Sequence, residues 1–193
     1  MENVTSNFLR ISGVCAIVAP ILLLSVDIFH LMTNADFIWT IGMWLSFALF
    51  VPAVIGVAYS VAASGSRLAY LGGALAFFGA MAGASMQVLF RTHAVLAEQG
   101  LETVNQQLRG TFKLVASTQM IGLTWPLGLL MLSVALFAVD RSKWLISLAL
   151  AAGAIAFPIG RIAFVQPAVI LSGFFFVVAF GLLGKQLMMQ PIR

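Results

Sequence analysis

Residues 37–62 have the sequence FIWTIGMWLSFALFVPAVIGVAYSVA, 26 positions without a charged side chain. A helix needs about 20 predominantly apolar residues to cross the hydrocarbon core of a bilayer. The rest of the chain has the same character, since 62% of its 193 residues are apolar, 8% are charged and the mean hydropathy is +1.07. A typical soluble domain has about 25% charged residues. We therefore expect an integral membrane protein, and the composition excludes soluble enzymes, disordered proteins and DNA-binding domains.

Five further apolar segments, one before this segment and four after it, are each long enough to cross a bilayer. The six predicted spans are residues 11–32, 37–62, 68–90, 112–139, 144–164 and 167–188. Most of the links between them are so short that neighbouring helices must run antiparallel. The expected fold is thus an all-α bundle of six transmembrane helices, arranged as three antiparallel hairpins in a single transmembrane domain.

The one long link, residues 91–111, has a pattern of its own. Leu101, Val104 and Leu108 recur every three or four positions among charged and amide side chains, which is typical of an amphipathic helix on a membrane surface. We expect this short surface helix over about residues 94–109, with a break from the preceding span at Gly100. Such a segment is either a solvated connector or a lid over a site, and the sequence leaves both open.

The distribution of Lys and Arg predicts the orientation of the chain. Six of these residues lie on the N-terminal side of the spans and four on the opposite side: Arg10, Arg67, Arg141, Lys143, Lys185 and Arg193 against Arg91, Arg109, Lys113 and Arg161. Cytoplasmic loops carry the excess of Lys and Arg in multi-pass proteins. We therefore expect a multi-pass protein of the cell membrane with both termini in the cytoplasm. The basic residues are too scattered for nucleic-acid binding, so no nucleic-acid partner is expected.

Polar side chains gather in the half of the bundle that faces outward in this orientation. Asp27 and His30 lie near the outer end of the first span, Gln87 and Arg91 near that of the third, and Arg161 near that of the fifth. With a rise of 1.5 Å per residue, Asp27, Gln87 and Arg161 lie at one level, about 10 Å outside the midplane. A lone charge at this depth is costly, so we expect Asp27 and Arg161 to form an ion pair.

Several polar residues at one level are typical of a pocket, although an Asp–Arg pair can also serve only to join two helices. In the pocket hypothesis, arginine binds the phosphate or carboxylate of an amphipathic or anionic small molecule or lipid, and tryptophan contacts its tail. The predicted ligand-binding residues are Trp44, Gln87, Arg91, Gln119, Trp125 and Arg161. If the protein is an enzyme, Asp27 and His30 are its catalytic acid–base pair. The sequence does not decide whether a reaction takes place.

Two other classes of function stay open. The only two histidines, His30 and His93, lie toward the same side of the membrane and could ligate a b-type haem. Alternatively, the chain is a non-catalytic subunit or a small carrier, with a second copy or another membrane subunit as its partner. The sequence requires no cofactor, and no metal site is expected, because Asp27 and His30 supply only two ligands on one helix. The apolar inner half of the spans disfavours a continuous aqueous path.

Overall fold

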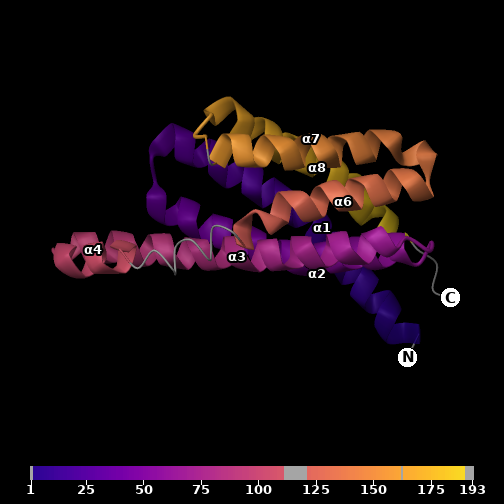
Figure 1. The fold of residues 1–193 in the computed structure, drawn as a ribbon, viewed down its shortest axis with the longest axis horizontal. Helices are drawn as coiled ribbons and strands as arrows, with labels where there is room; N and C mark the ends of the chain where they lie inside the picture. Colours follow the sequence, from indigo (N-terminus) through magenta and orange to yellow (C-terminus); the bar gives the residue numbers. More distant parts are fainter. Residues whose placement is uncertain (1, 111–120, 162, 190–193) are drawn as a thin grey trace.

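The computed structural model describes residues 2–110, 121–161 and 163–189, and over these residues the chain is helical without any strand (Figure 1). The helices are α1 (Glu2–Thr33), α2 (Asp36–Ala62), α3 (Arg67–Glu98), α4 (Glu102–Gly110), α6 (Thr124–Val139), α7 (Trp144–Arg161) and α8 (Gln166–Met188). A single turn of 3-10 helix, η1 (Arg141–Lys143), precedes α7. Five helices are long and apolar enough to cross a membrane, namely α1, α2, α3, α8 and α7 taken together with η1.

The predicted all-α membrane fold is confirmed, and five of the six predicted spans coincide with long apolar helices. The fourth predicted span, 112–139, is described only from residue 121 onward. Its described helix α6 has 16 apolar-rich residues, fewer than the about 20 that a crossing needs. Helix α6 therefore accounts for the C-terminal part of that predicted span.

The predicted surface helix begins later than expected. Residues 94–98 continue α3, and α4 begins only at Glu102. The break lies at Gly100, as predicted, where a φ of +71° is a conformation that favours glycine. The predicted start was wrong because α3 contains no helix-breaking residue beyond the apolar segment, so nothing ends the helix where the hydrocarbon would end. Helix α4 then folds back beside the last turns of α3 (Figure 1).

The helices pack side by side in a closed ring. Along this ring α1 contacts α2, α2 contacts α3, α3 contacts α6, α6 contacts α7, α7 contacts α8, and α8 returns to α1. Helix α2 also contacts α6 and α8 across the ring. The start of α1 and the end of α8 lie at one end of the bundle, and α4 projects from the opposite end, which we name the α4 end (Figure 1).

Six aromatic side chains, which we name the aromatic core, fill the middle of the ring. They come from α2, α6, α7 and α8 and are Phe47, Phe50, Trp125, Phe157, Phe176 and Phe180. The ring centroids of contacting pairs lie between 4.9 and 6.5 Å apart, and most pairs meet edge to face, the arrangement that aromatic quadrupoles favour. Over the described residues, this interior is that of a packed bundle and not of a water-filled pore.

Glycines bring α3 and α6 into backbone contact beside the aromatic core. A Cβ atom added at Gly79 would collide with the backbone of Trp125, and one added at Gly128 would collide with the backbone of Ala76. Small residues at helix crossings are the usual device for close packing in membranes. The close approach of the two helices places the Trp125 indole in the middle of the ring.

The outside of the ring is apolar. On α7, for example, Leu145, Leu148 and Ile155 are more than half exposed and share one side of the helix. A water-soluble monomer rarely exposes apolar patches of this extent. The outer surface and the five long apolar helices together indicate a membrane-embedded protein.

Candidate functional site

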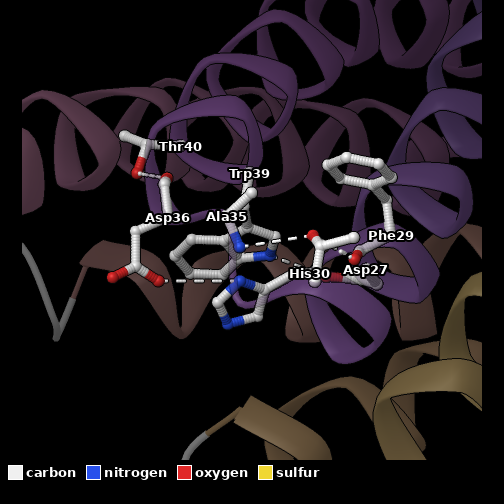
Figure 2. A network of polar contacts seen from close by, with 8 residues as sticks. Asp27, Phe29, His30, Ala35, Asp36, Trp39 and Thr40 are labelled. Carbon is white, nitrogen blue, oxygen red and sulfur yellow. Dashed lines mark hydrogen bonds and ion pairs between the residues drawn. The ribbon is translucent and has the colours of Figure 1, made fainter.

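Asp27 is the centre of a polar network at the α4 end of the bundle (Figure 2). Its side chain is 3% exposed. Arg161 donates from Nη2 to Asp27 Oδ2 at 2.6 Å, and Trp39 donates from Nε1 to Asp27 Oδ1 at 3.1 Å. The predicted Asp27–Arg161 ion pair is thereby confirmed, and the carboxylate joins α1, α2 and α7.

The turn between α1 and α2 brings Trp39 back over the end of α1. Asn34 adopts a φ of +52° there, and the Thr33 hydroxyl accepts a hydrogen bond from the backbone N–H of Ala35. The Trp39 and His30 rings stack with their centroids 5.0 Å apart, as Figure 2 shows. Asp27 and His30 are therefore linked through Trp39.

His30 is the second member of the predicted catalytic pair. Its Nδ1 lies 3.6 Å from Asp36 Oδ1, a distance longer than a hydrogen bond. Both Asp27 oxygens are engaged by Trp39 and Arg161. A catalytic role for Asp27 and His30 stays a prediction, whereas joining three helices is what the contacts of Asp27 accomplish.

Arg161 is held by a ring as well as by the carboxylate. Its Cζ lies 5.0 Å from the centroid of Phe157, one member of the aromatic core, close enough for a cation–π contact. Its Nε is buried and makes no hydrogen bond within the described part of the chain. The guanidinium is thus enclosed by the bundle, and its charge is paired with the Asp27 carboxylate.

A groove of about 420 Å³ lies between α2 and α3 at the α4 end. We name it the α2–α3 groove, and it is lined by Thr40, Ile41, Trp44, Gln87, Val88, Arg91, Thr92, Val95 and Leu96. Its volume falls within the range of about 300–1,000 Å³ that small-molecule sites occupy. Most of its walls are apolar, so it suits the chain of an amphipathic molecule.

Two polar side chains give the α2–α3 groove its chemistry. Gln87 is 5% exposed, and its buried Oε1 has no hydrogen-bond partner among the described residues. Arg91, one turn further along α3, donates from Nη1 to Glu98 Oε1 at 3.1 Å. Its Cζ also lies 5.1 Å from the centroid of the Phe37 ring. The groove therefore offers one neutral amide and one cation whose partner lies at the rim.

The structure divides the predicted ligand-binding set. Three members, Trp44, Gln87 and Arg91, meet in the α2–α3 groove. Arg161 instead pairs with Asp27, and Trp125 is 1% exposed within the aromatic core. Gln119 lies outside the described residues.

The two histidines have different partners, and the haem alternative stays a prediction. His93 is buried, and its Nδ1 lies 2.7 Å from Asn105 Oδ1 on α4. His30 stacks on Trp39 as described above. Within residues 2–110, 121–161 and 163–189, no three His, Cys, Asp or Glu side chains gather into a metal site.

Sequence reasoning missed two residues, Trp39 and Asn105. Trp39 was an interfacial aromatic with no visible partner, and Asn105 was one amide among several on an amphipathic helix. In the structure Asn105 is 1% exposed, and its Nδ2 also donates to the backbone carbonyl of His93. Asn105 therefore fastens α4 to α3.

No protein-family model, curated protein or solved structure matches the chain.

Proposed function

We propose that this membrane protein binds an amphipathic, lipid-like molecule in the α2–α3 groove. The observation that carries the proposal is the composition of that groove, in which apolar walls surround Gln87 and Arg91. The chain of the ligand lies against Ile41, Trp44 and Val88, and its head lies at Arg91. A guanidinium makes forked hydrogen bonds to phosphate and carboxylate, so an anionic group in the head suits this position.

The position of the groove supports entry from the bilayer. The groove is open at the outer surface of the helix ring, and it lies between two helices that are themselves long enough to cross the membrane. Along α3, Gln87 and Arg91 are separated by four residues, or about 6 Å. A ligand with its chain beside Trp44 would therefore meet the amide and then the cation as it approaches the membrane surface.

The same proposal includes the topology of the chain. The predicted span 112–139 would complete six crossings, and an even number of crossings agrees with the start of α1 and the end of α8 lying at one end (Figure 1). The excess of Lys and Arg at that end favours a cytoplasmic location for it. The α2–α3 groove then opens toward the outer leaflet of the cell membrane.

Filling the groove tests the proposal directly. Val88 lines the groove and is 56% exposed, whereas Val134 on α6 is 57% exposed and lies outside it. Val88→Trp should remove lipid that co-purifies with the protein, and Val134→Trp should not, as measured by native mass spectrometry after extraction in a mild detergent. Equal lipid adducts on both variants, at equal thermal stability, would overturn the proposal.

A further inference from the structure

The rim of the α2–α3 groove carries one charge of each sign. Arg91 is the only charged residue that lines the described groove, and its partner Glu98 is the last residue of α3. Both side chains are accessible, and exposed ion pairs of this kind contribute little to stability. Their charges are therefore available to a ligand at small cost.

The continuation of α3 beyond the apolar segment is what places Glu98 at the rim. Seven residues, about 10 Å along the helix axis, separate Arg91 from Glu98, so the two residues share a face of α3. Helix α4 folds back behind them and is fastened by the hydrogen bond between His93 and Asn105. The backbone position of Glu98 is thus set by the last turn of α3.

Neither charge is saturated by the ion pair. Nη1 of Arg91 contacts Glu98, while the guanidinium has five N–H donors in all. Oε1 of Glu98 accepts that bond, while a carboxylate has about four acceptor positions. A ligand can therefore bind both groups without separating them.

We infer, building on the proposed function, that the groove selects a lipid with a zwitterionic head, in which a phosphate lies next to an amine. The phosphate binds Arg91 and the ammonium group binds Glu98. A purely anionic head would face the Glu98 carboxylate, and an uncharged head would leave the ion pair unused. Gln87, one turn deeper, offers its amide to the polar atoms that link the head to the chains.

The experiment is a competition between two lipids that differ in the charge of the head. The delipidated protein is mixed with equal amounts of phosphatidylethanolamine and phosphatidylglycerol of the same chains, and the adducts are counted by native mass spectrometry. We expect the wild-type protein to favour phosphatidylethanolamine by about fivefold, the most that one exposed ion pair contributes. Glu98→Gln should abolish or reverse this preference, and Arg91→Gln should reduce the binding of both lipids.

Controls separate this inference from the proposed function. Glu102→Gln removes an exposed carboxylate on α4 that does not line the groove, and it should leave the preference unchanged. If the wild-type protein bound the two lipids equally, the inferred selection of a zwitterionic head would be wrong. The proposed function would still hold in that case, provided that Val88→Trp abolished the adducts. If free phosphoethanolamine bound as tightly as the lipid, the ligand would be a soluble zwitterion and not a lipid, and the inference would be wrong.

Discussion

Breaking the ion pair between Asp27 and Arg161 should destabilise the two single variants unequally. Asp27→Asn removes the charge but keeps an oxygen that can accept from Trp39 Nε1, so the loss is confined to the ionic interaction. The arginine left behind is 17% exposed and retains its contact with Phe157. Arg161→Gln instead leaves a carboxylate that is 3% exposed.

The structure gives approximate magnitudes for these losses. Removing one partner of a buried ion pair costs about 3–5 kcal/mol. We expect Asp27→Asn near the lower end, about 3 kcal/mol, and Arg161→Gln near the upper end, about 5 kcal/mol. The double variant buries no unpaired charge, so its loss should be no greater than that of Arg161→Gln alone. The two single losses sum to about 8 kcal/mol, so the coupling energy should be at least about 3 kcal/mol.

The assay is reversible unfolding in detergent micelles by titration with SDS, followed by circular dichroism. A control cycle combines Asp27→Asn with Arg67→Gln, because Arg67 lies at the start of α3, at the opposite end of that helix from the network. The control changes should add within about 0.5 kcal/mol. Additivity of the same quality between Asp27→Asn and Arg161→Gln would refute the reasoning.

Three further predictions concern the ends of the bundle. In a background without the native cysteine, a cysteine at Asn34 should react with a membrane-impermeant maleimide from outside intact cells and one at Ser64 only after lysis; the reverse would invert the proposed orientation. Hydrogen bonds from the Ser142 side chain and backbone, together with the charge of the neighbouring lysine, lower the pKa of Asp140 in the turn between α6 and α7. Ionised Asp140 should therefore stabilise the folded protein fully above its unfolded pKa of about 3.9. This stabilisation should be lost as the pH falls through the lowered pKa of the folded state, so Ser142→Ala should raise the pH midpoint of acid unfolding. Asn105→Leu leaves the buried histidine of α3 without its partner, so amide exchange across α4 should accelerate about 5- to 150-fold, the equivalent of about 1–3 kcal/mol; unchanged exchange would show that this hydrogen bond does not fasten α4.

Depth in the membrane was predictable from the sequence, because helix rise converts residue number directly into height. The pairing of Asp27 with Arg161 followed from this, because an unpaired charge within the hydrocarbon is costly and two opposite charges at one level can form an ion pair. The order of the helices around the ring was not predictable, because height says nothing about which helices are neighbours. Arg161 and Arg91 were therefore assigned to one pocket although they serve different contacts in the structure.

Trp125 shows a second limit of prediction from the sequence. The pocket hypothesis places this residue beside the tail of a bound ligand, yet the side chain lies in the aromatic core with Phe50 and Phe176. That position depends on the close approach of α3 and α6 at Gly79, and so on a contact between distant parts of the chain. The extension of α3 to Glu98 was missed for another reason, since hydrocarbon thickness limits only the part of a helix that is within the membrane.

Closure of the ring has a consequence for biosynthesis. The end of α1 and the start of α8 are neighbours in space, but more than 130 residues separate Thr33 from Gln166. At about 5–20 residues per second, a ribosome needs about 7–27 s to make that stretch. During this interval, α2 is the only one of the two ring neighbours of α1 that has been made. Asp27 has no ion-pair partner in the nascent chain until Arg161 is translated. The protein therefore passes through an open arc of helices, which becomes a ring when α7 and α8 emerge.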